Sequence, residues 1–397
     1  MLDSLLIKNF RSLEHLEVPK LGRVNLMVGK NNCGKSTVLE ALRIYAGNAQ
    51  RPLLEAIARG HDERFQAQDG EAFDADAVAP FQDFFTGRRF PETSQTVIAV
   101  GEINNPATLL TIKYSMLEEL EEVVTDDTGT TKRLRRFLHD LETKKETEEE
   151  EEEAEDGDLQ PVFVIHKGER SLPLLKLIAS KMIAPGLRSR VTFENTPSVP
   201  CSVVPTEFIS MDELADAWDA IALTAEEDVV KRALRIVSPE LESLVFVRAD
   251  GSAGSGRYRP MRTAMVKLTG MSRPVPLNSM GDGMLRVLQL SLKLFAAKGG
   301  FLLIDEFENG LHYSVQEKVW ALLFEVAERH NIQIFATTHS WDCIESFTKV
   351  AVERTQTDGV LFRLGRSART SDQGRVIATV FDETALQTIT QADVEVR

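Results

Sequence analysis

The clearest chemical pattern in the sequence lies near its start, where residues 29–36 read Gly-Lys-Asn-Asn-Cys-Gly-Lys-Ser. This is a full GxxxxGK[ST] match, placed between a strand-like stretch, 23–28, and a helix-like stretch, 36–46. Glycines let backbone N–H groups turn toward phosphate oxygens, and the N-terminus of a following helix adds a partial positive charge. We expect Lys35 to neutralise the β- and γ-phosphates, Ser36 to bind Mg²⁺ and Thr37 to reach the α-phosphate. The residues expected to bind nucleotide here are Gly29, Asn31, Asn32, Gly34, Lys35, Ser36 and Thr37.

Two adjacent carboxylates follow a second apolar run. Residues 301–304 read Phe-Leu-Leu-Ile, and Asp305 and Glu306 come directly after them. A buried parallel strand delivers such side chains to its C-terminal edge, where open α/β sheets bind ligands. We expect Asp305 to hold Mg²⁺ through water and Glu306 to act as the general base that polarises the attacking water.

A histidine follows the next strand-like segment, 332–337, in the sequence Thr338-His339-Ser340. At the end of a strand in the same sheet, an imidazole can reach a γ-phosphate. We therefore expect His339 to act in catalysis beside Lys35 and Glu306.

A second anion-receptive turn lies directly before a long amphipathic stretch. Like the Gly29–Ser36 segment, this turn combines a hydroxyl, from Ser279, with glycines, Gly281 and Gly283, at the expected start of a helix. One triphosphate does not need two such turns on one chain. A dimer does, if each chain closes its turn over the nucleotide of its partner, so we expect a homodimer or a higher homo-oligomer.

The elements that must position these residues follow from hydrophobic periodicity. Buried strand-like runs alternate with helix-like stretches (284–297, 315–329 and from 341) in the last third, which predicts an α/β fold with a mostly parallel sheet. A hairpin is expected over 96–103 and 109–116, and a helix over 211–237. Residues 117–153 are expected to form at most a short helical pair, which leads into an exposed acidic loop.

These elements suggest three parts of the chain. We expect an N-terminal lobe with the phosphate loop over 1–115, a helical and irregular insertion over 116–240, and a C-terminal lobe over 241–397. The insertion contains the acidic linker 146–158, which alone supplies ten acidic residues. Without it the net charge of −15 becomes −5, so the rest is only mildly acidic. A solvated linker explains the run, and a DNA mimic or a dock for a basic partner stays an alternative.

Composition narrows the class of protein. With 43% hydrophobic and 27% charged residues, the chain is neither disordered nor fibrous. Its three cysteines lack the spacing of a disulfide framework or a zinc cluster. No signal pattern and no long apolar span is visible, so we expect a cytoplasmic protein without membrane contact.

Together the motifs resemble those of the ABC-type ATPase head, in the branch that contains SMC-like and OLD-like AAA ATPases. The resemblance covers residues 1–47 and 270–345 and implies a P-loop NTPase head with a β-subdomain and a helical insertion. It implies a Mg²⁺-dependent ATPase that binds ATP, with Arg11 of the segment IKNFRS near the phosphates. The segments that carry it are IKNFRS, GKNNCGKST, NSMGDG, LIDEFENGLH and TTHS.

Departures from the pattern qualify this resemblance. The signature is not LSGGQ, no Q-loop glutamine can be assigned, and the tail after His339 is too short for a Toprim nuclease. The chain is thus similar to stand-alone ATPase subunits of bacterial anti-phage systems of the PARIS-like or Septu-like kind. That similarity implies a separate effector, a nuclease or Toprim-like protein, controlled by the nucleotide state.

Two other functions stay open. An SMC-like DNA-repair or recombination ATPase would contact DNA directly, through basic clusters at 132–136 or 257–262. An ATP-gated sensor or scaffold would hydrolyse hardly any ATP. A transporter cassette fits the signature least.

Overall fold

The computed structural model describes residues 1–63, 81–126, 129–139, 141, 159–177, 198–248, 262–354, 357–372 and 374–381. The chain divides into two compact units. The first consists of Met1–Asp3, Val18–Leu39 and Val199–Arg397, and the second of Ser4–Glu17 and Glu40–Ser198.

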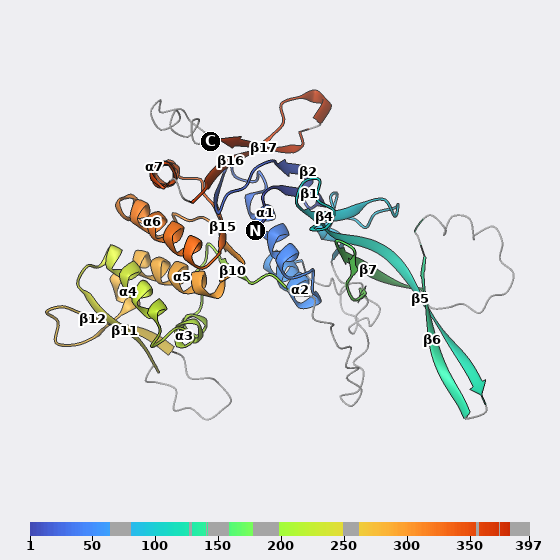
Figure 1. The fold of residues 1–397 in the computed structure, drawn as a ribbon, viewed down its shortest axis with the longest axis horizontal. Coiled ribbons are helices and arrows are strands. Elements are labelled where there is room, and N and C mark those ends of the chain that lie inside the picture. Colours follow the sequence, from blue (N-terminus) through green and yellow to red (C-terminus); the bar gives the residue numbers. More distant parts are fainter. Residues whose placement is uncertain are drawn as a thin grey trace, which may run out of the picture. The chain divides into compact units, whose positions relative to one another are not determined.

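The first unit is built on a six-stranded sheet (Figure 1). In spatial order its strands are β10 (Cys201–Val204), β14 (Phe301–Ile304), β15 (Gln333–Thr337), β3 (Val24–Val28), β16 (Gly359–Arg366) and β17 (Val376–Phe381). All neighbours are parallel except the final pair, β16 and β17. Every residue of β3, β14 and β15 is buried, as expected for strands covered on both faces. The predicted mostly parallel sheet is confirmed.

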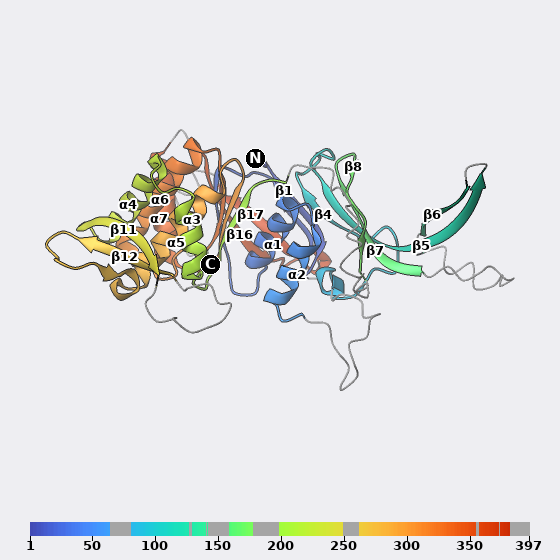
Figure 2. The same ribbon diagram turned by 90° about the horizontal axis from the view of Figure 1, so that it is seen from below.

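Helices α3 to α7 of this unit gather on one side of the sheet in both views (Figures 1 and 2). They are α3 (Met211–Asp219), α4 (Ala225–Val237), α5 (Asp282–Ala296), α6 (Tyr313–Arg329) and α7 (Trp341–Glu353). A small antiparallel sheet of β11 (Leu241–Arg248), β12 (Arg262–Leu268) and β13 (Val275–Pro276) packs with them. The helices expected over 284–297, 315–329 and from 341 are confirmed.

The single helix expected over 211–237 is in fact two helices. The chain breaks between α3 and α4, where Leu223 adopts a left-handed φ of 64°. Thr224 then starts α4, because its hydroxyl accepts a hydrogen bond from the N–H of Glu226.

The second unit is built on an antiparallel sheet in the order β2-β1-β4-β5-β7-β8, with β6 on β5 and β9 on β7. Its strands are β1 (Leu5–Phe10), β2 (Leu13–Val18), β4 (Val97–Gly101), β5 (Leu110–Asp126), β6 (Gly129–His139), β7 (Leu159–Lys167), β8 (Arg170–Ser171) and β9 (Leu175–Lys176). Helix α2 (Arg51–Gly60) also belongs to this unit, and α1 (Lys35–Ala46) begins in the first unit and ends in the second. The hairpin expected over 96–103 and 109–116 is confirmed as β4 and β5.

Two expectations for the middle of the chain were wrong. The segment 117–139, expected as a helical pair, continues β5 and forms β6. Register places the acidic strand opposite the basic one, so that Glu119 pairs with Arg136, whose Nε lies 2.9 Å from its Oε1. Such cross-strand charge pairs stabilise a sheet and offset the helical propensity of the Glu–Leu run.

The expected domain boundary after residue 115 falls inside β5, and the strands around it belong to one sheet. It therefore does not separate two folding units. The acidic linker 146–158 lies outside the described residues. Among the described residues, no helix combines the length and apolar character needed to cross a membrane.

Candidate functional site

The predicted site residues of the first unit come together at one edge of the parallel sheet. Strand β3 lies between β15 and β16, and β14 lies on the other side of β15. Because these strands are parallel, the loops after their carboxyl ends lie at the same edge. These loops carry the Gly29–Ser36 segment, the Asp305–Glu306 pair and Thr338–His339.

The Gly29–Ser36 loop has the backbone of a phosphate-binding turn. Gly29 and Gly34 have φ of 147° and 95°, and Asn32 has φ of 61°. A Cβ on Gly29 would lie 2.4 Å from the carbonyl oxygen of Leu364, so this position requires glycine. The loop leads into α1, whose first residue, Lys35, donates from Nζ to the carbonyls of Gly29 at 2.7 Å and Lys30 at 3.2 Å. Thr37 follows on the same helical turn.

A hydrogen-bonded chain links the loop to the carboxylate strand. Ser36 Oγ donates to Asp305 Oδ2 at 3.2 Å. Thr337 Oγ1 donates to Asp305 Oδ1 at 2.6 Å and accepts from the N–H of Glu306 at 2.8 Å. The buried Thr337 thus fixes both the side chain of Asp305 and the backbone of Glu306.

The oxygens of Ser36 and Asp305 fit Mg²⁺. This ion prefers hard oxygen ligands and binds proteins through one or two carboxylates, while substrate phosphates and water complete its octahedron. Among the described residues, no cluster of three or more His, Cys, Asp or Glu side chains could form a metal cage of protein ligands alone. The donor set therefore suits a metal bound together with a phosphate group.

His339 is held by the acidic residues of the carboxylate loop. Glu308 Oε1 accepts from the backbone N–H of His339 at 3.0 Å and lies 3.2 Å from its Nδ1. Glu306 Oε1 lies 3.6 Å from the same ring nitrogen. The Glu308 side chain is only 11% exposed, whereas Glu306 and His339 are 38% and 54% exposed. Glu308 therefore orients the ring, and Glu306 and His339 face solvent together.

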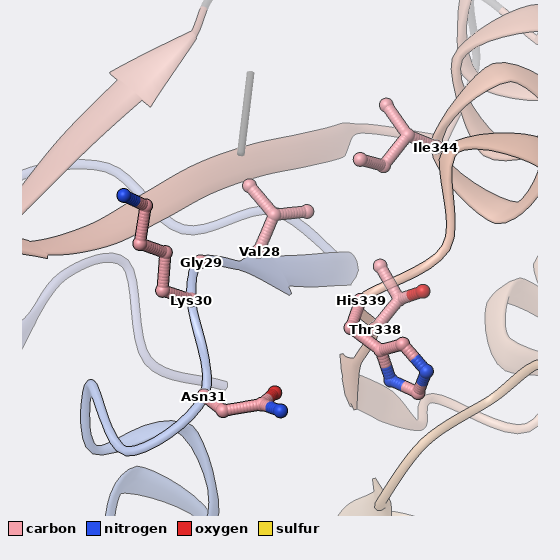
Figure 3. A pocket seen from close by; sticks show the side chains of 7 residues that line it. All are labelled: Val28, Gly29, Lys30, Asn31, Thr338, His339 and Ile344. Atoms are coloured by element: carbon pink, nitrogen blue, oxygen red, sulfur yellow. The ribbon is translucent and has the colours of Figure 1, made fainter. Parts of the chain in front are cut away.

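A cavity of about 350 Å³ opens between the phosphate loop and the loop that carries His339 (Figure 3). Figure 3 shows the Asn31 amide on one side and Thr338 and His339 on the other. The lining residues are Val28, Gly29, Lys30, Asn31, Thr338, His339 and Ile344. A polar group can thus reach the cavity from each of two loops.

The second anion-receptive turn does not line this cavity. Ser279 lies in a short 3₁₀ turn, Leu277–Met280, where its exposed hydroxyl donates to the carbonyl of Pro276 at 2.7 Å. Gly281, with φ of 92°, precedes α5, and a Cβ on Gly283 would lie 3.1 Å from the carbonyl oxygen of Gly310. The turn therefore packs beside the segment that follows the two carboxylates.

Arg11 lies in the second unit, where its side chain is bound by acids. Its Nε lies 3.0 Å from Glu40 Oε2, and its Nη1 lies 2.6 Å from Glu63 Oε1. The side chain is only 9% exposed, and its guanidinium also lies 5.1 Å from the ring centroid of Phe84. These contacts describe a structural ion-pair cluster, and a phosphate contact of Arg11 stays a prediction.

The two basic clusters considered for DNA are only partly described. Arg136 pairs with Glu119, and Arg262 pairs with Asp219 at 2.7 Å and Asp216 at 3.4 Å. The side chains of 132–135 and the whole of 257–261 lie outside the described residues. The described members of both clusters are therefore neutralised by acids.

Sequence reasoning missed one charged residue of the site. Arg286 on α5 is fully buried, and its guanidinium donates to the carbonyls of Asp305 and Glu306. The signal was a lone arginine within the apolar run Met284–Leu292 (MLRVLQLSL). A cation at such a position requires a buried polar partner.

Comparisons with known families identify two regions of the chain. A model described as "AAA ATPase domain" matches residues 1–172. A second, described as "AAA domain, putative AbiEii toxin, Type IV TA system", matches residues 226–342. Both descriptions name an AAA domain, the first names an ATPase, and each model matches less than half of the chain.

Two individual proteins share a limited fraction of identical residues with this chain. An ATP/GTP phosphatase of Helicobacter pylori is 22% identical over 367 residues, which cover 89% of each protein. An uncharacterized protein of Methanocaldococcus jannaschii is 33% identical over 85 residues, which are 21% of this chain and 71% of that protein.

Solved structures with some likeness include SMC head domains. That of Thermotoga maritima is 15% identical, with 96% of this chain and 99% of that one covered and a TM-score of 0.41. An SMC head of Pyrococcus furiosus, bound to the C-terminal domain of ScpA, is 12% identical, with 99% of both chains covered and a TM-score of 0.46. The strand order of the parallel sheet and the backbone of the Gly29–Ser36 segment are features of a P-loop fold in their own right.

Proposed function

We propose that this AAA-type ATPase binds ATP with Mg²⁺ at the edge of the parallel sheet, hydrolyses it, and uses the nucleotide state to control a partner protein. The observation that supports this most directly is the chain of hydrogen bonds from Ser36 through Asp305 and Thr337 to Glu306. It joins a phosphate loop to a candidate general base.

Each residue has a role that its position supports. The amides of the Gly29–Ser36 loop and the Lys35 ammonium bind the phosphates, and Ser36 and Asp305 hold Mg²⁺. The metal neutralises phosphate charge when bound. Glu306 accepts a proton from the attacking water, and His339, oriented by Glu308, binds the γ-phosphate from the other side of the cavity.

The proposed active form is a homodimer with two nucleotides between the chains. The exposed Ser279 turn stands outside the cavity of its own chain, so in this proposal it completes the site of the partner. Its hydroxyl and the start of α5 suit an anion.

We propose that the partner is a separate effector, such as a nuclease or a Toprim-like protein, in anti-phage defence. One matching family is described as "putative AbiEii toxin, Type IV TA system", a toxin–antitoxin system, and this supports only the idea that the chain acts with a second protein. The OLD-like, PARIS-like or Septu-like assignment rests on the same motifs and stays part of the proposal.

Two variants test the enzyme. Lys35→Ala should lose ATP binding, measured by titration with a fluorescent ATP analogue. Glu306→Gln should bind ATP but hydrolyse it about 100-fold more slowly, and should accumulate a nucleotide-bound dimer in light scattering. Lys349→Ala, which removes a surface amine paired with Glu317, is the matched control.

Unchanged ATP binding by Lys35→Ala, or a fully active monomer, would contradict the proposal. Co-expression with the product of the neighbouring gene tests the effector: it should copurify with Glu306→Gln in ATP and be released from the wild type by hydrolysis. Salt-dependent DNA binding without any protein partner would favour the DNA-repair alternative instead.

A further inference from the structure

Arg286 is a charged side chain within the hydrophobic core. It lies in the second turn of α5, is fully buried, and is surrounded on the same helix by buried apolar residues. Burial of an unpaired cation costs several kcal/mol or more, so a buried arginine requires polar partners. Here Nη1 and Nη2 have such partners, and Nε makes no hydrogen bond among the described residues. Its partners are therefore informative.

The guanidinium binds backbone carbonyls at the carboxylate loop. Nη2 donates to the carbonyl oxygens of Asp305 and Glu306, each at 2.7 Å, and Nη1 donates to that of Pro205 at 2.6 Å. Burial lowers the pKa of Arg286 to about 10, opposed by the nearby carboxylates of Asp305, Glu308 and Glu306. The group is thus a cation at neutral pH, where it binds carbonyl dipoles.

The backbone that Arg286 binds is in an unfavourable conformation. Glu306 has a φ of 48°, in the left-handed region, where a residue with a Cβ is strained by about 1 kcal/mol or more. This conformation turns the carbonyls of Asp305 and Glu306 toward the same guanidinium nitrogen. It also aims the Glu306 N–H at Thr337 and brings the carboxylate to within 3.6 Å of His339. A strained backbone at a candidate general base needs a group that holds it.

The same helix touches the other end of this loop. A Cβ on Gly283 would lie 3.1 Å from the carbonyl oxygen of Gly310, and one on Gly310 would lie 3.4 Å from Asp282. The first turn of α5 therefore packs on Gly310, while its second turn binds Asp305 and Glu306 through Arg286. Because α5 begins directly after the Ser279 turn, that turn and the carboxylate loop are attached to one rigid element.

We propose that Arg286 is a positioning residue that holds Glu306 in its left-handed conformation and couples it to the Ser279 turn at the start of α5. This rests on the proposed function, in which Glu306 is the general base and the Ser279 turn reads the nucleotide of the partner. A displacement of that turn then changes the backbone of the general base without any direct contact between the two.

Hydrogen exchange of the full chain without nucleotide tests the structural half of the proposal. In Arg286→Met, the amides of Glu306 and Phe307, which donate to Thr337, should exchange about tenfold faster or more. Amides of α6 should keep wild-type exchange, which shows that the fold is intact. Lys293→Met is the control, because it removes a cation from the same helix that pairs only with Glu213 in the described residues.

Arg286→Lys keeps the charge but loses the fork that reaches several carbonyls at once, so it should give an intermediate exchange rate. If Arg286→Met does not fold, the exchange rate of Arg286→Lys decides whether Arg286 holds Glu306. Wild-type exchange at Glu306 in the folded variant would overturn the proposal.

Kinetics test the catalytic half. Arg286→Met should lower kcat about tenfold or more and leave the affinity for a fluorescent ATP analogue within about threefold. Equal loss of affinity and kcat would overturn a positioning role. If the wild type has no ATPase activity, the proposed function fails, and the exchange experiment still decides whether Arg286 holds Glu306.

Discussion

Ser36 Oγ lies 3.2 Å from Oδ2 of Asp305, although the two residues are 269 positions apart in the chain. They meet because β3 and β14 are separated by only one strand, β15, in a parallel sheet. A hydroxyl from the first turn of α1 and a carboxylate directly after β14 thereby form an oxygen pair. The position of this pair depends on Thr337, which donates to the second carboxylate oxygen of Asp305.

Removal of the Thr337 hydroxyl should therefore be costly. Thr337→Val keeps the shape of this fully buried side chain but removes the donor to Asp305 Oδ1, which keeps only the 3.4 Å bond from Ser36, and the acceptor of the Glu306 N–H. We expect a loss of about 1–3 kcal/mol in the free energy of unfolding, measured with urea, together with a lower kcat. Thr348→Val is the control, because its buried hydroxyl only donates to a carbonyl of its own helix. Equal losses in both variants would show that Thr337 has no special role.

Glu308 should control the orientation of His339. The Glu308 carboxylate lies 3.2 Å from Nδ1 of His339 and favours the tautomer with the proton on that nitrogen. Glu308→Gln removes this carboxylate. We expect about a tenfold drop in kcat with ATP affinity within about threefold, and a changed tautomer ratio in ¹⁵N spectra of His339. Glu317→Gln, on an exposed pair with Lys349, serves as the control. An unchanged tautomer ratio would contradict the assignment.

Gly29→Ala should disrupt the phosphate loop. The new Cβ would lie 2.4 Å from the carbonyl oxygen of Leu364 and 2.8 Å from Cys33 Sγ, at a φ of 147° that alanine rarely adopts. We expect a loss of about 2 kcal/mol or more in stability and a loss of ATP binding. Gly365→Ala tests the neighbouring strand, since a Cβ there meets nothing within 4 Å. Equal stability of the two variants would refute the steric argument.

His61 should make the second unit more stable in mild acid. Its hydrogen bond with Glu40 raises its pKa above the ordinary 6.5. Because the folded state holds this proton more tightly, the extra stability is complete below pH 6.5 and disappears as the pH rises through the folded pKa.

The measurement is the difference in unfolding free energy between wild type and His61→Gln across this pH range. In a Glu40→Gln background the pH-dependent part of the difference should become much smaller, because the main cause of the raised pKa of His61 is removed. A difference that grows with rising pH would contradict the prediction.

The segments of the candidate site that are continuous in the chain could be predicted from the sequence. The Gly29–Ser36 loop, the strand before Asp305 and the strand before His339 each carry their own pattern, and parallel strand order then brings them to one edge. The contacts of Thr337 and Arg286 could not be predicted, because they depend on strand neighbours and on the facing side of α5.

The error over 117–139 has a different cause. The run LEELEEVV satisfies helical periodicity, and only a basic strand placed opposite it makes the extended form favourable. The propensity of one segment alone could not reveal that pairing, since the partner residues belong to the following strand, Gly129–His139. Arg11 shows a similar limit, because its contacts with Glu40 and Glu63 come from distant segments.

The place of β3 in its sheet has a consequence for biosynthesis. Its two neighbours, β15 and β16, begin at Gln333 and Gly359, more than three hundred residues after β3 itself. More than three hundred further residues must therefore be synthesised after β3 before it acquires a neighbouring strand on either side. Such distant pairing is slow, and it leaves the apolar strand β3 without neighbouring strands until those residues have been made.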